Sequence, residues 1–390
     1  MFLDAPIGEA HNAAVSKEAV GRIVFWGTYD LSKPRSRILL GGLKDIGADV
    51  TEIHADIWPV HADKSQMGAG AFITALLRAL LWYPVLIFRF LLIPRDAVVV
   101  VPYLGTLDVL VLWPFARLRN QRVVWDMFLS LYDTVVNDRQ MISERGLLSR
   151  VLYSVEWLAA RAADLVLLDT RAHAEYVAGL MGLPSNKTGW VPVGAEADCF
   201  RRLAPSRARD GRPRVLFYGQ LIPLHGIETI LKAALSDRGR AIDWHIIGTG
   251  QDRYKIDAAL NPGSAEHVRH QEWVPYEQLI ESIGAADICL GIFGASDKAA
   301  CVVPNKVYQA LLSGRAVITR DSSAMRETFG DGAGLKLVPH SDPEALLDAI
   351  DALEAEGFAA MPEKQLAIAS PRHVAERFRN VIAPTTSAAG

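Results

Sequence analysis

Cysteine is scarce in this chain, since three occur in 390 residues and no two of them form a C-x-x-C pair. The sequence therefore predicts neither a disulfide framework nor a structural zinc site, and it fits a reducing, cytoplasmic compartment. The first 21 residues include acidic side chains and lack a long apolar core, so we expect no signal peptide. A net charge of −3 offers no electrostatic argument for nucleic acid as a partner.

Several common catalytic motifs are also missing. The chain has no Walker P-loop, no H-E-x-x-H, no G-x-S-x-G and no D-x-D pair. These absences argue against the P-loop nucleotide triphosphatases, the zinc proteases and the serine hydrolases. Because no acidic cluster suits a metal ion, we expect a reaction that uses neither a metal nor a resident cofactor.

The chain does have length and apolar material. Half of its 390 residues are hydrophobic and 22% are charged, which is typical of a globular protein with two domains. Short apolar runs alternate with helical segments, as in parallel sheets that are buried on both faces. We expect strands at 22–26, 49–53, 97–101, 122–125, 165–168, 188–191, 214–218, 244–247, 267–273, 287–290, 316–319 and 334–338.

The domain boundary is expected at residues 201–214, RRLAPSRARDGRPR, which are rich in Arg, Pro and Gly and have no apolar periodicity. We predict an α/β fold with two doubly wound, Rossmann-like domains that face a cleft, at 1–205 and 206–370. The remaining segment, 371–390, is expected to hold a helix that packs back on the first domain, followed by a tail. Ligands of open α/β sheets bind beyond the carboxyl ends of the strands, so the cleft is the expected site.

One segment departs from this pattern. Residues 72–93, FITALLRALLWYPVLIFRFLLI, are almost wholly apolar and long enough to span a bilayer. Arg78 and Arg89 interrupt the run, and an arginine at the bilayer centre costs roughly 2.5–3.5 kcal/mol on insertion scales, which disfavours a span. Two alternatives stay open: a helix in the membrane interface with its arginines towards lipid phosphates, or a core helix of the first domain.

The strongest candidate for a binding site is the segment 290–319, LGIFGASDKAACVVPNKVYQALLSGRAVIT. It is typical of a strand, a loop with Asp297 and Lys298, a helix that begins at or just before Asn305, and a second strand. Lys298 and Lys306 stand beside the start of that helix, where backbone N–H groups point outward. This combination suits a bound phosphate.

Glycine turns follow several predicted strands. They lie at Gly27, at Gly219, at Gly248 with Gly250, and at Gly291 with Gly294. Glycine permits a tight turn and a close approach of the backbone to a ligand. None completes a G-x-G-x-x-G pattern, so ordinary strand-to-helix connections are the alternative for each turn.

Several sequence blocks follow one another in a characteristic order. The second half holds FYGQLIPLHGIETIL (217–231), IIGTGQ (246–251), AADICLGIF (285–293), PNKVYQALLSGRAVITRDSSAMRE (304–327) and DGAGLKLVPHSDPEALLDAI (331–350), and the first half holds SLYDTVVNDR (130–139), ADLVLLDT (163–170) and WVPVGAE (190–196). The blocks of the second half resemble the donor domain of GT-B glycosyltransferases, in particular the large retaining class with an E-x(7)-E motif, often called family 4. Those of the first half resemble the acceptor domain of bacterial members that build surface polysaccharides. The resemblance covers about residues 20–380.

The resemblance implies a retaining hexosyltransferase that moves a sugar from a nucleotide diphosphate sugar to a carbohydrate or polyprenyl-linked acceptor, in polysaccharide or glycolipid biosynthesis. The donor would bind the second domain and the acceptor the first. The enzyme would be cytoplasmic, or peripheral on the cytoplasmic face of the membrane. Two alternatives stay open: a non-catalytic subunit that binds nucleotide and partners an active transferase, and a GT-B sugar-nucleotide epimerase.

The chain departs from the family at the positions that carry the chemistry. The family's Arg and Lys that neutralise the donor diphosphate correspond here to Gln220 and His225. The second Glu of the motif corresponds to Gln309. The first has no clean equivalent, since Cys301 occupies the nominal spacing and Asp297 is the nearest carboxylate.

We therefore expect other residues to take these roles. A leaving diphosphate needs positive charge where its negative charge develops, and Lys298 and Lys306, with Asn305 at the helix start, are the candidates. Gln309 is expected to hydrogen-bond ribose hydroxyls, and Asp297 to contact the donor sugar. The alternatives are solvated lysines, an N-cap and an ordinary loop acid.

The first half supplies one further catalytic candidate, Asp126, at the carboxyl end of the strand at 122–125. We predict that it orients an acceptor hydroxyl, with helix capping as the alternative. The set predicted to be catalytic is thus Asp126, Asp297 and Lys306. Gly27, after the first strand, is expected to approach the donor phosphates, and His225 to bind them, unless it only shapes a turn. More polar residues follow Asp126 closely: Ser130, Asp133, Asp138 and Arg139.

Overall fold

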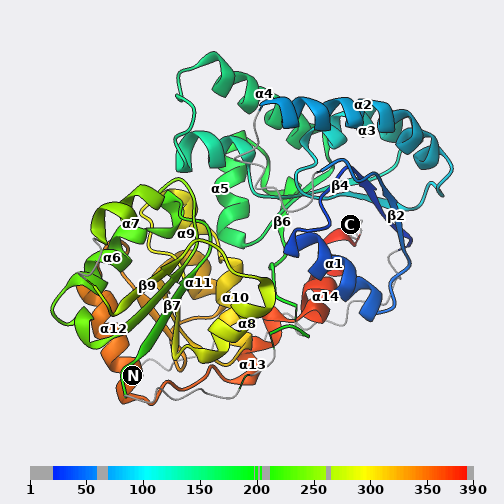
Figure 1. Ribbon diagram of the computed structural model, residues 1–390. Helices are drawn as coiled ribbons and strands as arrows, with labels where there is room; N and C mark the ends of the chain where they lie inside the picture. The colour runs from blue at the N-terminus through cyan, green and yellow to red at the C-terminus, as the bar shows by residue number, and fades with distance from the viewer. Residues whose placement is uncertain are drawn as a thin grey trace, which may run out of the picture.

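The computed structural model describes residues 21–58, 69–196, 198–200, 203, 211–260 and 265–383 (Figure 1). These residues form two six-stranded sheets in which every pair of neighbouring strands is parallel. The predicted boundary at 205/206, most of the segment 1–21 considered for a signal peptide, and the last seven residues of the tail lie outside the described residues.

The first sheet has the strand order β2-β1-β3-β4-β5-β6. The inner strands β1, β3 and β5 are apolar runs, IVFWG, VVVV and LVLL, and they are largely buried on both faces, which explains their continuous apolar sequence. The strands are β1 (Ile23–Gly27), β2 (Val50–His54), β3 (Val98–Val101), β4 (Val123–Phe128), β5 (Leu165–Leu168) and β6 (Thr188–Trp190). The helices are α1 (Pro34–Asp45), α2 (Ala69–Leu91), α3 (Thr106–Arg119), the π-helical segment η2 (Asp133–Asp138), α4 (Leu147–Ala162), α5 (Arg171–Met181) and the turn η3 (Ser185–Lys187).

Helices cover both faces of this sheet. The residues of α2, α3, α4 and α5 share one hydrophobic core with one side of the strands, and α1 lies on the other side. The last helix of the described chain, α14 (Pro371–Ile382), packs beside α1 (Figure 1). The contact is close, because a Cβ built on Gly42 would lie 2.1 Å from the Pro371 carbonyl oxygen.

The second sheet has the strand order β12-β11-β10-β7-β8-β9. Its strands are β7 (Arg214–Tyr218), β8 (Asp243–Ile247), β9 (Val268–Gln271), β10 (Ile288–Leu290), β11 (Ala316–Arg320) and β12 (Leu335–Val338). Its helices and helical turns are η4 (Pro223–His225), α6 (Ile227–Leu235), η5 (Gly239–Ala241), α7 (Arg253–Ala259), α8 (Tyr276–Ala285), α9 (Asp297–Cys301), α10 (Asn305–Leu312), α11 (Ser323–Thr328), α12 (Pro343–Ala355), α13 (Glu363–Leu366) and η6 (Ala367–Ala369).

The strand order changes direction between β1 and β3 in the first sheet and between β7 and β10 in the second. Such switch points open a crevice at the carboxyl ends of the strands, which is where doubly wound sheets bind ligands. The predicted fold class is confirmed, and the predicted strands agree with the observed ones within two residues at each end, except that β4 continues three residues further than predicted.

The structure adds two elements that the sequence pattern did not predict. The expected loop at Asp297 and Lys298 is the short helix α9, which Ser296 caps by accepting a hydrogen bond from the amide of Ala299. The polar stretch after β4 forms η2, which Ser130 helps to begin because its hydroxyl accepts the amide of Asp133. These elements carry several side chains of the cleft between the sheets.

Candidate active site between the two sheets

Polar groups from both halves of the chain meet where the strands of the two sheets end. Arg139, directly after η2, donates from Nη2 to the Oε1 atom of Gln220 after β7, over 3.0 Å. The carbonyl oxygen of Arg139 accepts a hydrogen bond of 2.9 Å from the Gln251 side chain. The hydroxyl of Thr170 donates to the Cys301 carbonyl. The facing edges therefore form one continuous site.

Lys306, in the first turn of α10, is the most unusual group of this site. Its side chain is only 7% exposed, and its ammonium has no hydrogen-bond partner in the described part of the chain. The Nζ atom lies 4.0 Å from the centroid of the Phe217 ring. Burial lowers the pKa of Lys306 well below its ordinary value. A buried polar group without a partner is rare and marks a candidate ligand site.

Gly219 lies beside this ammonium at the end of β7. Its φ of +135° is a conformation that side chains rarely adopt. A Cβ built there would lie 3.1 Å from Lys306 Nζ and 3.3 Å from the Cε1 atom of His225. The absence of a side chain therefore lets the Lys306 ammonium and the His225 ring approach the backbone of the β7 turn closely.

His225 completes the group on the second sheet. Its Nδ1 atom contacts the carbonyl oxygen of Gln220, so Nδ1 carries the proton and donates it. Burial lowers the pKa of His225 well below its usual range, and the nearby charges of Lys306 and Arg139 lower it further. The positive charges of Lys306 and Arg139 therefore oppose protonation of His225, and an anion placed among these groups would weaken that effect.

The start of α10 adds two polar side chains. The Oδ1 atom of Asn305 is buried and has no partner among the described residues. The Tyr218 hydroxyl lies 3.0 Å from the Lys306 carbonyl oxygen and 3.2 Å from Gln309 Oε1. Gln309 is thereby fixed beside Lys306 with its amide oxygen towards Tyr218. The structure thus brings together five of the predicted donor-site residues: Gly219, His225, Asn305, Lys306 and Gln309.

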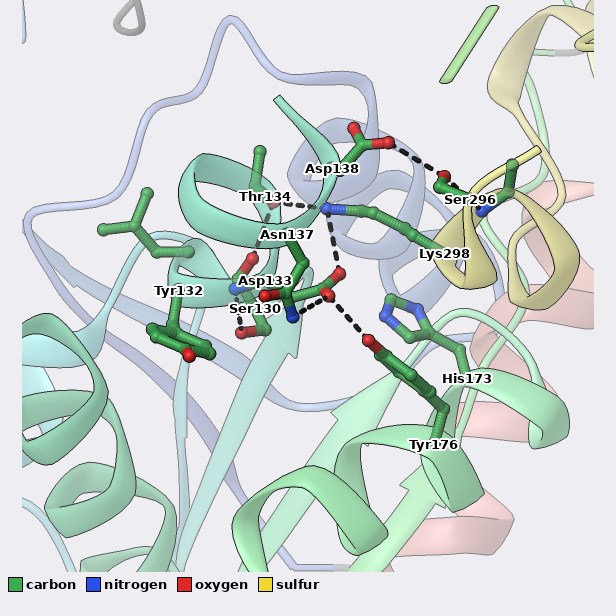
Figure 2. Close-up of polar contacts among 12 residues, drawn as sticks. Ser130, Tyr132, Asp133, Thr134, Asn137, Asp138, His173, Tyr176, Ser296 and Lys298 are labelled. Carbon is green, nitrogen blue, oxygen red and sulfur yellow. Dashed lines mark hydrogen bonds and ion pairs between the residues drawn. The ribbon is translucent and has the colours of Figure 1, made fainter. Parts of the chain in front are cut away.

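Lys298, the second predicted phosphate ligand, has a different environment. It reaches from α9 to η2, where its Nζ lies 3.7 Å from Asp133 Oδ2 and donates to the Thr134 hydroxyl (Figure 2). Asp133 also accepts a hydrogen bond of 2.7 Å from the Tyr176 hydroxyl. The positive charge of Lys298 is paired with the Asp133 carboxylate in this contact between the two halves. In this arrangement it is not free to neutralise a diphosphate.

Asp297 stays exposed at the start of α9 and lines a cavity of about 530 Å³ between the two halves. Burial raises the pKa of Asp138, and the nearby charge of Lys298 opposes that shift. The cavity offers carboxylate, amide and hydroxyl groups, which are the usual partners of sugar hydroxyls. Its polar lining includes Asp133, Asn137, Asp138, Gln140, Tyr176 and Ser296.

Asp126, predicted to orient an acceptor hydroxyl, does not face this cavity. Its carboxylate is buried and lies 2.7 Å from Arg35 Nη2. Arg35 also donates to the carbonyl oxygens of Val191 and Pro192, over 2.6 and 3.0 Å. A buried carboxylate needs such a partner. Asp126 therefore ties β4 to α1 and to the segment after β6, and this placement does not support the predicted catalytic role.

The remaining glycine turns have structural explanations. A Cβ on Gly27 would lie 2.4 Å from Asp108 Oδ2, and this carboxylate accepts the amide of Thr28 over 2.8 Å. Cβ atoms on Gly248 and Gly250 would lie 1.9 and 2.6 Å from the carbonyl oxygens of Gly219 and Leu221. Gly27, Gly248 and Gly250 are thus required by close internal packing, and the latter two support the Gly219 turn.

Sequence reasoning placed Arg139 in a polar cluster but did not assign it to the donor site. The sequence did contain a signal for this role. The resembling family carries an arginine at the position of Gln220, and a diphosphate site that lacks this cation needs another one. Tyr176 and Thr134 had no such signal. Their contacts with Asp133 and Lys298 depend on how α5 and η2 meet α9 in space.

Comparison with known proteins agrees with this geometry. Residues 212–356 match the family model described as Glycosyl transferases group 1. The match lies within the second half and spans its sheet from β7 to β12. The match includes all five residues that meet around Lys306 in this half. No curated protein sequence matches the chain.

Solved structures resemble most of the chain. The sucrose-phosphate synthase of Thermosynechococcus elongatus is 17% identical, with a TM-score of 0.63 over 93% of this chain and 94% of that protein. Anabaena Alr3699/HepE in complex with UDP and glucose is 13% identical, with a TM-score of 0.62 over 94% of this chain and 100% of that one. At these identities the likeness shows the fold, which is GT-B.

Proposed function

We propose that the protein is a glycosyltransferase that moves a sugar from a nucleotide diphosphate sugar to a carbohydrate or lipid-linked acceptor. The observation that carries this proposal is the buried, unpartnered ammonium of Lys306 beside Gly219 and His225, with Arg139 approaching from the other half. A diphosphate in this space would give Lys306 its missing partner. The group 1 glycosyltransferase domain and the GT-B fold support the same function.

The proposed reaction breaks the bond between the anomeric carbon and the diphosphate oxygen, and the electron pair leaves with the diphosphate. The acceptor hydroxyl oxygen forms the new bond to the anomeric carbon, and its proton passes to the departing diphosphate. Lys306 and Arg139 stabilise the charge that develops on the leaving group. Since these side chains supply the positive charge, we propose a reaction without a metal ion. Retention of configuration is proposed from the resemblance to the E-x(7)-E class.

The polar cavity beside Asp297 is the proposed place of the transferred sugar and the acceptor hydroxyl. Asp297 comes from the second half and Asp138 from the first, and both line the cavity. Carboxylates there would accept hydrogen bonds from sugar hydroxyls. We propose a role in polysaccharide or glycolipid biosynthesis at the cytoplasmic face of a membrane.

Calorimetric titration of UDP and UDP-glucose tests the donor site, and these ligands come first because UDP and glucose are bound in the HepE structure. A hydrogen bond between charged groups contributes about 1.5–3 kcal/mol, so Lys306→Met should weaken UDP binding about 10- to 150-fold. Lys364→Met, the same change at an exposed position in α13, is the matched control. Absence of binding by any nucleotide diphosphate to folded wild-type protein would refute the proposal.

A non-catalytic nucleotide-binding subunit is the second candidate. Two residues that were predicted to act in the site form ion pairs instead, and this favours the second candidate. Asp126 pairs with Arg35, and Lys298 pairs with Asp133. Incubation with UDP-sugars and a panel of acceptors separates the two functions. Nucleotide binding without transfer, hydrolysis or epimerised sugar across the panel would favour the subunit, whereas a transferred sugar would exclude it.

A further inference from the structure

Helix α2 is attached to the first sheet along one side. Tyr83, Leu86 and Phe90 are buried there, the Trp26 indole donates to the Leu86 carbonyl over 3.0 Å, and the Tyr83 hydroxyl donates to Asp108 over 2.8 Å. The part Ile73–Leu91 is long and apolar enough to cross a membrane by length and composition, and 33% of that window is buried. The helix therefore lies along the sheet with its other side uncovered.

The uncovered side of α2 is a stripe of large apolar side chains. Leu77, Leu81, Val85 and Phe88 follow one another at intervals of three or four residues, which places them on one side of the helix, and Leu92 follows directly after its end. Leu81 is 77% exposed and Leu92 70%. Soluble monomers rarely expose a continuous apolar patch of this kind without a binding role.

The neighbouring helices extend the patch. Helix α3 packs between α2 and α4, and all three cover the same face of the first sheet (Figure 1). Exposed apolar side chains continue across them, with Trp113 and Leu118 on α3 and Leu147 and Leu148 on α4. We call the exposed face of α2, α3 and α4 the apolar face.

The charges on this face have one sign. Arg78, Arg89, Arg117 and Arg150 are exposed on the three helices. The acids within the three helices are Asp108 and Glu156, and both are buried and accept hydrogen bonds from neighbouring groups. Asp108 accepts the Thr28 amide and the Tyr83 hydroxyl, and Glu156 accepts the Ser130 hydroxyl and the Leu131 amide. An apolar surface rimmed by exposed arginines complements an anionic lipid surface better than it complements water or a neutral protein.

We propose that the apolar face docks on an anionic lipid bilayer. The leucine stripe of α2 lies among the acyl chains near the headgroups, and the arginines contact lipid phosphates. This orientation also bears on the acceptor, a step that depends on the proposed glycosyltransferase function. Gln140 lines the polar cavity, and the exposed Met141, Leu147 and Leu148 follow it towards the apolar face. The acceptor class is thus an amphiphile, with its hydroxyl-bearing headgroup in the cavity and its lipid chain in the bilayer.

Co-sedimentation of the full-length protein with vesicles tests the docking. We expect binding to vesicles of phosphatidylcholine with phosphatidylglycerol, and much less to phosphatidylcholine alone. Leu77→Glu combined with Leu81→Glu should abolish binding, because it puts two charges into the stripe. Arg78→Gln and Arg89→Gln should each weaken binding about fivefold. Trp273→Glu, an equally drastic change at a residue 75% exposed on the other half, should bind as the wild type does.

Equal binding of the wild type and the double leucine variant would overturn the proposal, as would equal binding of the wild type to vesicles with and without phosphatidylglycerol. Sedimentation velocity covers the other occupant of such a face, a second copy of the chain. A wild-type dimer that the leucine variant converts to a monomer, without vesicle binding, would also overturn it. UDP titration of the same variants separates the docking proposal from the proposed function. The double leucine variant should bind UDP like the wild type. If neither the wild type nor this variant binds UDP, the result counts against the donor site and not against the docking.

The acceptor step has its own measurement. Transfer to a polyprenyl-linked acceptor in vesicles should fall with the double leucine variant, whereas transfer to a soluble sugar acceptor should not. A wild-type enzyme that docks on vesicles but prefers the soluble acceptor would overturn the amphiphile assignment and leave the docking intact.

Discussion

Lys298 Nζ lies 3.7 Å from Asp133 Oδ2, and this ion pair joins α9 of one half to η2 of the other (Figure 2). Both side chains are almost fully buried, at 3% and 1% exposure. Burial lowers the pKa of Lys298, and the carboxylate of Asp133 opposes that shift. Beside the pair, Ser296 donates to Asp138 over 2.9 Å, so the contact between the halves is a hydrogen-bonded network.

Removal of one partner of this pair should destabilise the protein. Lys298→Met or Asp133→Asn leaves a buried group uncompensated, with an expected loss of about 3–5 kcal/mol in the free energy of unfolding for Lys298→Met. The double variant should recover a large part of that loss, because no buried charge is left alone. Urea unfolding of the four proteins gives the coupling energy. A coupling energy near zero would show that the pair contributes nothing.

This ion pair also shows where prediction from sequence ends. The strands were predictable because buried parallel strands are continuous apolar runs, such as Val98–Val101. The start of α10 near Asn305 was also predictable, because it depends on residues that are neighbours in the chain. By contrast, Lys298 and Asp133 are far apart in the chain, and no local pattern states that they meet. The same holds for Asp126, whose burial depends on Arg35.

Lys306→Met should stabilise the protein in the absence of ligand. The ammonium is buried without a hydrogen-bond partner among the described residues, and such a group costs about 1–3 kcal/mol. Methionine keeps the length of the side chain and its contact with Phe217 while removing the charge. Thermal unfolding should therefore show a higher Tm for the variant that binds UDP worse. A lower Tm would indicate that the lysine is a structural group.

The stability gap between Lys306→Met and wild type should depend on pH. Folding lowers the pKa of Lys306 well below its ordinary 10.5, so the unfolded chain binds more protons at pH values between the two. Wild-type stability therefore rises with pH through that window. The advantage of the variant should be largest at low pH and shrink as the pH approaches 10.5. Tm values of both proteins across pH check this, and a gap that widens would contradict it.

Asp126→Asn should separate a structural role from a catalytic one. The change leaves Arg35 buried without its carboxylate, so we expect a loss of about 3–5 kcal/mol in unfolding free energy. The UDP affinity of the protein that remains folded should not change, because Asp126 does not reach the donor group. Urea unfolding and calorimetry on the same preparation measure both quantities. Full stability with lost transfer activity would restore the catalytic role.

Arg139→Gln should weaken UDP binding with little effect on stability. The guanidinium contacts Gln220 over 3.0 Å, at the position where the resembling family carries its own arginine. Loss of one charged hydrogen bond predicts roughly 10- to 150-fold weaker binding. Arg145→Gln, an exposed arginine nearby, is the matched control.

A compensating change makes the role of Arg139 more specific. Gln220→Arg in the Arg139→Gln background returns a cation to the same space from the other half, so UDP affinity should recover. Calorimetry of the double variant measures the recovery. If the single variant binds UDP like wild type, Arg139 has no part in the donor site. If both the single and the double variant bind UDP weakly, the position of the cation matters as well as its charge. In that case a guanidinium that starts after β7 does not reach the phosphates that Arg139 reaches from the end of η2.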